Sequence, residues 1–245
     1  MSWYAYCLTE QPSGTRVRRP HLLEGVQGVN GAAVLNYPSG EFAVVVSEFD
    51  RSAGPLDQKF VLEHAKVVSA CFRIGTVLPF RFGTIFDSDE ALRQAVRANR
   101  RTFGLSVARL RGKSEMHLKV TVRDGSLREA MIDIDLPDTV GGEYLSKLRE
   151  KASRQRERQT KARAVSVQVH KLFNPLEEEV SCKRVQQDGM QIDIAHLIDS
   201  KTVEKYQNRY NSATKQLENC EIAISGPWPP YHFMPGKLRT VAGNS

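Results

Sequence analysis

The sequence lacks paired cysteines and long hydrophobic runs, and each absence excludes a class of protein. Its four cysteines are far apart and form no CxxC pair, so neither a zinc ribbon nor a dithiol redox motif is predicted. No segment approaches the roughly 18 consecutive apolar residues that a membrane span needs. Residues 1–8 are apolar but short, and they lack the basic residues of a secretion signal. We therefore expect a cytoplasmic protein whose cysteines are reduced thiols of the core.

Motifs that would carry chemistry are missing as well. The six histidines show no HExxH or HxH spacing and no cysteine pair beside them, so no metal ligands are predicted. The segment 25–31 is rich in glycine but lacks the GxGxxG spacing and the GKS/T ending of phosphate-binding loops. The acidic run 177–179 is expected to be a solvated connection. With no nucleophile, base and orienting group at a recognisable spacing, we expect no enzyme, no catalytic residue and no cofactor.

The composition is that of an ordinary globular protein with a basic excess in one place. Hydrophobic residues make up 40% and charged residues 26% of the chain, which predicts a packed core rather than disorder. The net charge of +7 comes from 35 basic and 28 acidic residues. The segment 147–163 alone holds eight basic residues against Glu150 and Glu157. Such a segment indicates nucleic acid or an acidic protein surface as a partner.

Short β-branched or aromatic stretches and longer helical patterns follow one another in the first part of the chain. Strands are expected at residues 3–8, 32–35, 42–49 and 76–86. In the last of these, Phe80, Phe82 and Phe86 would share one face of the strand. Helices are expected at residues 56–71 and 87–110, the second beginning at a capping-box pattern.

A second pattern begins at Gly112 and has the order strand, helix, strand, strand, helix, strand. The expected elements lie at residues 115–122, 142–173, 180–185, 190–197, 201–217 and 221–225, with a turn at 187–189. This is the order of a ferredoxin-like split βαβ unit, in which two helices cover one face of a four-stranded antiparallel sheet. The sequence therefore predicts an α+β protein of two domains. The first, 1–111, is a mixed α+β domain, and the second, 112–245, is a ferredoxin-like (β-α-β-β-α-β) domain that ends in a tail rich in proline and aromatic residues.

The long helix expected at 142–173 has an apolar stripe that is interrupted in its middle. Gln155 and Gln159 stand on this face between two apolar groups. The apolar positions are Leu145, Leu148, Ala152, Ala162, Val165, Val169 and Leu172. We expect both ends of the helix to pack better than its centre, whose turns would be exposed and basic.

Three interpretations of this basic centre remain open. A ferredoxin-like domain that recognises RNA uses exposed aromatic residues on its central strands, but segments 116–122 and 190–196 contain none. Contact with an acidic protein surface, or a merely solvated helix, is therefore favoured over a nucleic-acid-binding module. The candidate contact residues are Arg154, Arg156 and Arg158.

Three sequence blocks, spread in order over nearly the whole chain, resemble those of the gas vesicle protein GvpL/GvpF family. The block 78–84 (LPFRFGT) follows a helix containing a histidine and resembles the family's vlPmrFGt motif, with Phe80 where methionine is common. The block 112–120 (GKSEMHLKV) resembles its gk-E-x-x-lKv strand. The ending 226–233 (GPWPPYHF) is similar to its GPWPPYsF ending, and the opening residues 3–6 fit its aromatic first strand.

This resemblance implies a protein needed to form gas vesicles, the hollow protein-walled buoyancy organelles of some bacteria and archaea. It also implies an N-terminal α+β domain followed by a modified ferredoxin-like domain. Family members are minor structural or assembly proteins that contact the small hydrophobic shell protein, of the GvpA type, and other accessory proteins. The expected location is the gas vesicle, with a cytoplasmic pool during assembly. The family carries no known catalytic residue, so the resemblance assigns none.

The motif blocks also contain candidate contact residues. The prolines between 227 and 230 lack amide hydrogens and are expected to stop the last strand. Trp228 and Tyr231 would then either seal the second domain or dock a partner, and sealing is favoured. Arg81 is expected to be a strand residue held by a carboxylate such as Glu63, rather than a partner-binding arginine.

Overall fold

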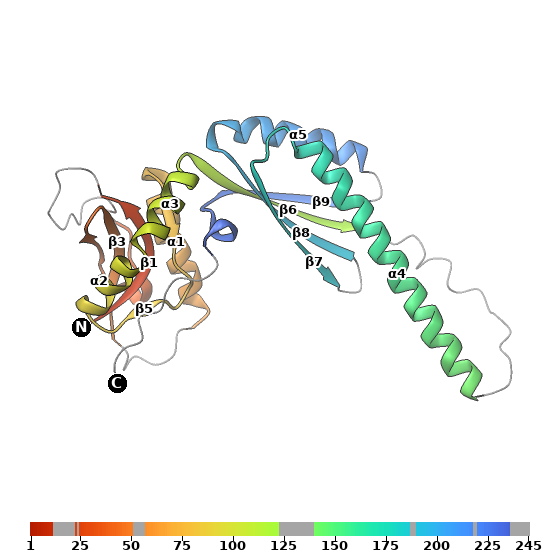
Figure 1. Cartoon of the computed structure of the whole chain (residues 1–245), viewed down its shortest axis with the longest axis horizontal. Helices are drawn as coiled ribbons and strands as arrows, with labels where there is room; N and C mark the ends of the chain where they lie inside the picture. Colours follow the sequence, from red (N-terminus) through yellow and green to blue (C-terminus); the bar gives the residue numbers. More distant parts are fainter. Residues whose placement is uncertain are drawn as a thin grey trace. The chain divides into compact units, whose positions relative to one another are not determined.

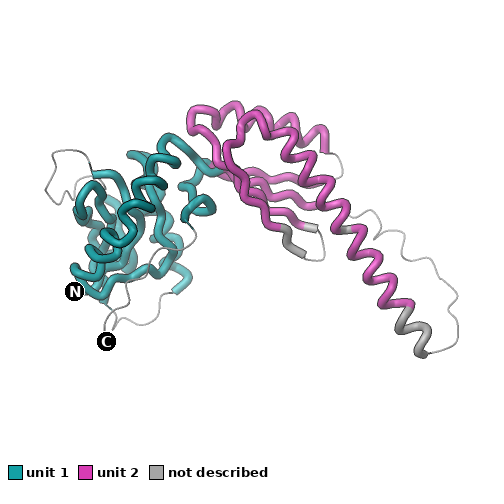
Figure 2. The backbone as a smooth tube through the Cα atoms, in the orientation of Figure 1, with its two compact units in different colours: residues 1–115, 227–245 teal, residues 116–226 magenta. Residues whose placement is uncertain are grey.

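A computed structural model of the 245-residue chain describes residues 1–11, 23, 25–50, 57–122, 140–186, 190–217 and 220–235. The chain divides into two units, coloured separately in Figure 2. Unit 1 comprises Met1–Glu115 together with Pro227–Ser245, and unit 2 comprises Met116–Gly226. Both contain helices and antiparallel strand pairs, so the mixed α+β class is confirmed. None of the helices in the described ranges is both long and apolar enough to cross a membrane.

Unit 1 is organised around β1 (Ser2–Glu10), the strand with the most neighbours in a five-stranded sheet. It pairs antiparallel with β3 (Phe42–Phe49), β4 (Val77–Pro79) and β5 (Ile85–Phe86). β2 (Val34–Ser39) extends the sheet beyond β3. The aromatic opening of the chain is a strand, as predicted, and it lies in the middle of the sheet.

One face of this sheet is covered by α1 (Lys59–Ile74). Tyr4 and Tyr6 of β1 belong to the same buried cluster as Val67 of the helix. The helix starts and ends three residues later than the predicted span 56–71. Its apolar stripe thus packs on the sheet in the manner that the helical spacing predicted.

The opposite face is covered by α2 (Asp89–Ala98) and α3 (Arg100–Leu110). Because side chains alternate along a strand, Trp3 points away from Tyr4, and its Nε1 donates to Oδ1 of Asp89 at 2.7 Å. The Phe103 ring of α3 packs edge-on against Phe42 of β3, with 6.2 Å between ring centroids. Burial between two helical layers explains why residues 3–8 are all buried.

The helix predicted at 87–110 is in fact two helices. The backbone departs from helical geometry at Asn99, where φ is −107° and ψ is 7°. Ser88, rather than Asp87, caps the first helix, and its hydroxyl accepts a hydrogen bond from the Ala91 amide at 3.1 Å. The bend at Asn99 was not predicted because the apolar stripe continues through it.

The strand predicted at 76–86 is also interrupted. β4 ends at Pro79, and a turn follows in which Thr84 N and Oγ1 both bond to the Arg81 carbonyl, at 3.1 and 2.7 Å. Gly83 has a φ of 83°, a left-handed conformation that a side chain would disfavour. The single aromatic face predicted for this segment does not form, because the turn redirects the chain.

The four cysteines are free thiols but not all of them are in the core. Cys7 and Cys71 are buried in unit 1, and burial next to Cys71 raises the pKa of the Cys7 thiol. Cys182 is exposed, so the prediction of a core position is wrong for this residue.

Unit 2 holds a four-stranded sheet with the strand order β7-β8-β6-β9. Its strands are β6 (Lys113–Val122), β7 (Glu179–Gln186), β8 (Met190–Asp199) and β9 (Cys220–Trp228). Two helices alternate with them along the chain, α4 (Val140–Phe173) and α5 (Val203–Gln216), the second preceded by the turn η5 (Ser200–Thr202). This is the predicted succession of elements. The turn predicted at 187–189 lies outside the described residues.

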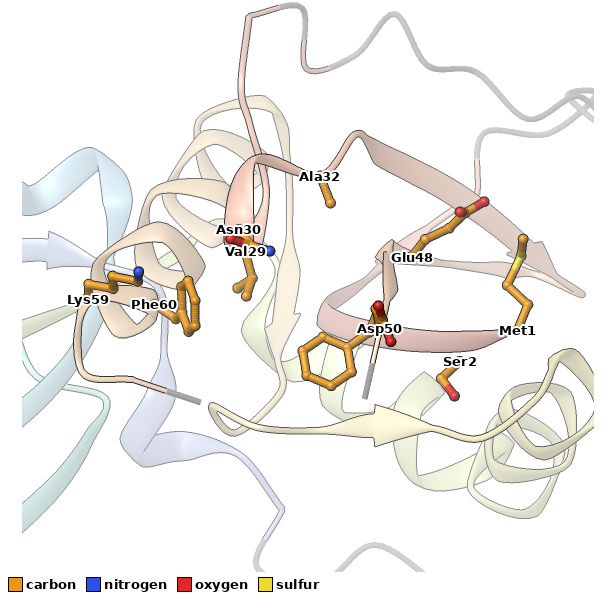
Figure 3. Close-up of a pocket in the computed structure, with 10 residues that line it drawn as sticks. Met1, Ser2, Val29, Asn30, Ala32, Glu48, Asp50, Lys59 and Phe60 are labelled. Atoms are coloured by element: carbon orange, nitrogen blue, oxygen red, sulfur yellow. The ribbon is translucent and has the colours of Figure 1, made fainter. Parts of the chain in front are cut away.

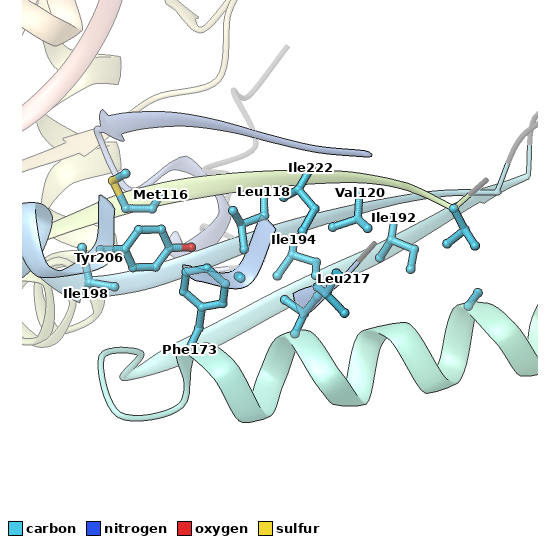
Figure 4. Close-up of a cluster of buried hydrophobic side chains, with 14 residues drawn as sticks. Met116, Leu118, Val120, Phe173, Ile192, Ile194, Ile198, Tyr206, Leu217 and Ile222 are labelled. Atoms are coloured by element: carbon cyan, nitrogen blue, oxygen red, sulfur yellow. The ribbon is translucent and has the colours of Figure 1, made fainter. Parts of the chain in front are cut away.

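The core of unit 2 lies between the sheet and its helices (Figure 4). Met116, Leu118 and Val120 alternate along β6 and point to the same side, each no more than 1% exposed. Phe173 of α4 and Tyr206 of α5 pack there with ring centroids 4.7 Å apart. The aromatic pair fixes the last turn of α4 against α5.

Helix α4 packs with its C-terminal half only. Val169 and Phe173 are 1% exposed, whereas residues 146–157 are all exposed. Figure 1 shows the N-terminal half of the helix running past the end of the sheet. The prediction that the N-terminal end also packs is wrong at Leu148, which is 44% exposed, and at Ala152. The sheet is too short to reach them.

The end of the chain differs from its prediction in two ways. β9 continues through Pro227 to Trp228, because an edge strand tolerates a residue without an amide hydrogen. The segment from Pro227 onward then belongs with unit 1, where η6 (Tyr231–Phe233) lies. The division observed is thus 1–115 with 227–245 and 116–226, whereas 1–111 and 112–245 were predicted.

Candidate functional site

A buried tyrosine and histidine support the turn of the LPFRFGT block in unit 1. Tyr4 Oη accepts a hydrogen bond from the Gly83 amide at 3.2 Å and lies 3.0 Å from His64 Nδ1. The Gly83 amide donates to Tyr4 Oη, and the tautomer of the neutral imidazole decides which of Tyr4 Oη and His64 Nδ1 donates to the other. Burial lowers the pKa of His64 to about 4 and raises that of Tyr4 to about 12, so both groups are uncharged at neutral pH.

Phe82 closes this cluster on its outer side. Its ring lies 6.0 Å from the His64 ring and 6.3 Å from the Tyr4 ring, both edge to face. It is also 37% exposed, so part of an aromatic face is open to solvent. The helix α1 exposes three more apolar side chains, Val61 at 41%, Leu62 at 68% and Ile74 at 56%. Unit 1 therefore presents apolar groups from α1 and from the turn that His64 supports.

Arg81 does not have the role that the sequence predicted. It is an exposed residue of the turn rather than of a strand. Glu63, the proposed partner, instead accepts a hydrogen bond from the Asn30 amide, with 2.8 Å between Asn30 N and Glu63 Oε2. Asn30 has a φ of 58°, and the carboxylate holds this left-handed residue in place.

A second polar contact fixes the glycine-rich segment over β1. Tyr6 Oη accepts from the Val29 amide at 2.7 Å and lies 2.8 Å from Ser47 Oγ. A Cβ on Gly28 would stand 2.3 Å from the Tyr6 oxygen. The segment 25–31 is thus a structural loop packed on a tyrosine. That it binds no phosphate stays a prediction from its glycine spacing.

A cavity of about 370 Å³ opens beside this segment (Figure 3). Val29, Phe49 and Phe60 form apolar parts of its wall. Glu48, Asp50 and Lys59 bring charges of both signs to it. The wall of the cavity thus combines apolar and charged groups.

The tail after β9 is anchored in unit 1 by a buried carboxylate. Glu115 is fully buried, and it accepts hydrogen bonds from the backbone N of His232 at 2.8 Å and from His232 Nδ1 at 2.7 Å. Arg109 donates to the carbonyl oxygen of Phe233, a residue only 5% exposed. These contacts hold the chain ending against unit 1 at His232 and Phe233.

Trp228 and Tyr231 do not fill that sealing position. Trp228 is 43% exposed and Tyr231 39%, whereas Pro229, Pro230 and Phe233 are buried. Sealing by the two aromatics was favoured from the sequence because they are the largest side chains of the ending. The structure gives the sealing role to smaller neighbours and leaves the indole and phenol partly accessible.

Unit 2 contains a buried polar chain of its own. Tyr206 Oη lies 2.6 Å from His196 Nδ1, and His196 Nε2 lies 3.1 Å from Glu177 Oε2. Glu177 Oε1 pairs with His170 Nδ1 at 2.5 Å. Burial raises the pKa of Glu177, which His170 opposes, and lowers the pKa of His196 to about 4. His196 is only 1% exposed and His170 is the exposed end of this chain, which ties α4, β8 and α5 together.

Glu177 also corrects a prediction. The acidic run 177–179 was expected to be solvated, yet the Glu177 side chain is only 4% exposed. The buried acids Glu115 and Glu177 were both missed as structural residues. Glu115 accepts from a histidine 117 residues away in the sequence, and Glu177 lies 3.1 Å from a histidine of β8. Local spacing contains no signal for such a pair.

The candidate basic residues lie on the unpacked half of α4. Arg154 and Arg156 are exposed, and Arg154 pairs with Glu150 one turn earlier. Arg158 belongs to the same helix, but its side chain lies outside the described residues. A charged helix that projects from its sheet is available to a partner without any rearrangement of the core.

Comparisons with known proteins agree on one family. The model of the family described as gas vesicle synthesis protein GvpL/GvpF matches residues 2–235. The crystal structure of the gas vesicle protein GvpF from Anabaena is similar, with a TM-score of 0.75 at 19% identity over 96% of this chain and 97% of that one. GvpF from Microcystis aeruginosa gives a TM-score of 0.70 at 19% identity over 96% and 99% of the two chains. No curated protein sequence matches significantly.

Proposed function

Because the chain belongs to the gas vesicle synthesis protein GvpL/GvpF family, we propose that it binds the hydrophobic shell subunit while the vesicle wall forms. The observation that carries the proposal is the family match over residues 2–235, which covers all of unit 2 and all of unit 1 except Met1 and residues 236–245. The role is that of a minor structural or assembly protein of the gas vesicle, working with other gas vesicle proteins. It requires recognition and no catalysis.

The exposed apolar groups of unit 1 support this role. A hydrophobic shell monomer aggregates before it joins the wall, and a companion with an apolar surface holds it in solution. Leu62 and Val61 on α1, with Phe82 on the neighbouring turn, offer such groups. We propose that the shell subunit contacts the exposed side of α1 at Val61 and Leu62, and we expect the cavity bounded by Phe49 and Phe60 to receive an apolar side chain.

Unit 2 supports the same assignment through its topology. Its strand order β7-β8-β6-β9 and its succession of elements are consistent with a ferredoxin-like domain, which is the second domain implied by the sequence blocks. We propose that unit 2 is a modified ferredoxin-like domain. Its long α4 is the modification, since half of that helix extends beyond the sheet.

A binding experiment with purified shell subunit tests the function. Leu62→Asp on α1 is expected to weaken binding about tenfold or more, because the contact of one leucine is worth roughly 1.5–3 kcal/mol. Leu105→Asp is the matched control, since Leu105 is 65% exposed on α3, on the other face of the sheet, and Leu62 is 68% exposed. The proposal fails if the intact chain does not retain the shell subunit. Equal effects of both substitutions would exclude α1 as the contact surface but would leave the proposed function standing.

A nucleic-acid-binding module remains the second candidate, because the basic stretch of α4 is exposed. Such a module would be retained on heparin at moderate salt, and Arg154→Gln with Arg156→Gln would shorten retention. Retention that these substitutions leave unchanged would exclude it.

A further inference from the structure

The apolar stripe of α4 has a seven-residue repeat that continues beyond the part covered by the sheet. Counting Ala152 as the first position, a, and Leu148 as the preceding d, core positions recur alternately three and four residues apart to the end of the helix. Of the C-terminal members of this series, Ala162, Val169 and Phe173 are buried in unit 2, and Ser166 is partly buried. One helical seam therefore serves the core of unit 2 and then runs out of it.

The exposed members of the seam are Leu148, Ala152, Gln155 and Gln159. Leucine and alanine on such a face are ordinary coiled-coil core residues, and polar residues in the middle of a seam fix its register at some cost in affinity. The two glutamines that interrupt the stripe would thus fix the register of a paired helix. A helix intended only for solvent needs no apolar residue at these positions.

The described side chains that flank the exposed half of the seam all carry the same sign of charge. Positions e and g hold Arg149, Lys151, Arg156 and Arg163, each exposed. The two acids, Glu150 and Glu157, fall at position f, on the far side of the helix. There they pair with Arg154 and with Lys161, the second at 2.8 Å. The acids therefore neutralise outward-facing bases and leave a basic border along the seam.

Flanking charges decide which helix a coiled-coil seam accepts. A second copy of α4 would bring basic residues against basic residues, which opposes self-association. A helix with an apolar stripe bordered by glutamate or aspartate would match both the seam and its borders. We propose that the exposed half of α4 pairs with an acidic amphipathic helix of a partner protein. This inference goes beyond shell binding, since it needs neither the shell subunit nor unit 1.

Nucleic acid fits the same residues less well. The affinity of a phosphate backbone depends on the number of basic side chains that it contacts. It does not depend on whether these side chains border an apolar seam. Position c, which points away from the seam, holds three further bases, Lys147, Arg154 and Lys161. The two groups of bases can be removed separately with equal changes in charge, which separates the two kinds of partner.

The experiment uses the full chain and a synthetic acidic helix of about three heptads, with leucine at a and d and glutamate at e and g. One variant carries Arg149→Gln, Lys151→Gln and Arg156→Gln beside the seam. Its matched control carries Lys147→Gln, Arg154→Gln and Lys161→Gln on the outer face. A third variant, Leu148→Gln, changes the seam without changing charge. Fluorescence anisotropy at low salt gives the affinities, circular dichroism confirms helicity, and a single-stranded oligonucleotide serves as the alternative probe.

The wild-type chain is expected to bind the acidic helix and not the same peptide with lysine at e and g. The variant beside the seam should bind roughly five- to tenfold more weakly, from three lost charge pairs, and the outer-face control less than about threefold. Leu148→Gln should weaken binding of the peptide and leave the affinity for the oligonucleotide unchanged. Failure to bind the acidic helix overturns the proposal, and so does equal weakening by both triple variants. Preference for the oligonucleotide would assign the surface to nucleic acid, whatever the outcome of the shell experiment.

Discussion

Each unit keeps one histidine buried and uncharged. His64 in unit 1 is 4% exposed and bonded to a tyrosine, and His196 in unit 2 is 1% exposed with the same kind of partner. Both imidazoles have a pKa of about 4 because burial disfavours the charged form. In the unfolded chain they take up protons near their ordinary pKa of about 6.5. Acid therefore favours the unfolded state through both residues.

The pH dependence of stability follows from these values. Between about pH 6.5 and 4 the unfolded chain binds more protons at His64, so stability falls as pH falls, by about 2 kcal/mol at pH 5. Replacing it by glutamine, His64→Gln, should remove this part of the loss while lowering stability at pH 7. Thermal unfolding from pH 7 to 5 measures it. Glu177, whose raised pKa has the opposite sign, makes His196 the poorer choice for the test. An unchanged slope in His64→Gln would contradict the assignment.

Two glycines of unit 1 should respond oppositely to alanine. Gly28→Ala places a methyl group 2.3 Å from Tyr6 Oη and should cost about 1–3 kcal/mol by overpacking. Gly104→Ala lies in α3 with open space around the new methyl group and should stabilise by roughly 0.5–1 kcal/mol. Chemical denaturation of both variants gives the difference. A neutral Gly28→Ala would mean that the glycine-rich loop is not pressed on Tyr6.

At the scale of elements, the carboxylate of Glu115 holds the turn η6 in its place. Glu115→Gln puts an amide where two donors from His232 converge, and the lost acceptor should cost about 1–3 kcal/mol. Glu10→Gln, at an exposed pair with Arg111, should change stability by less than about 1 kcal/mol. Limited proteolysis after β9 should be faster only in Glu115→Gln. Equal proteolysis in both variants would show that Phe233 holds the tail without help from the carboxylate.

Helix α4 should divide into a half that stabilises the fold and a half that does not. Phe173→Ala removes a buried ring that contacts Tyr206 and should cost about 3–5 kcal/mol. Leu148→Ala changes an exposed side chain and should stay within about 0.5 kcal/mol. Unfolding of the two variants is compared directly. A large effect at Leu148 would require a packing partner within the chain.

At the scale of the molecule, local periodicity predicted most elements and none of the long-range polar contacts. β3 agrees with its prediction residue for residue, since an apolar run bounded by turn residues has one interpretation. The helix 87–110 and the strand 76–86 were predicted as single elements because their breaks, at Asn99 and near Gly83, depend on backbone angles that the apolar pattern does not contain. The basic stretch of α4 is exposed as predicted, but because the N-terminal half of the helix extends past the sheet rather than because two glutamines interrupt its stripe. The burial of Glu115 and Glu177 required knowledge of which distant segments meet.

The chain leaves unit 1 after Glu115 and returns to it at Pro227. Unit 2 is thus inserted into unit 1, and all its residues emerge from the ribosome before the tail that carries Phe233. During translation the second unit can complete its fold while the first still waits for its last anchoring residues. A nascent chain stalled when all of unit 2, but not the tail, has left the ribosome would therefore hold a finished unit 2 and an unfinished unit 1.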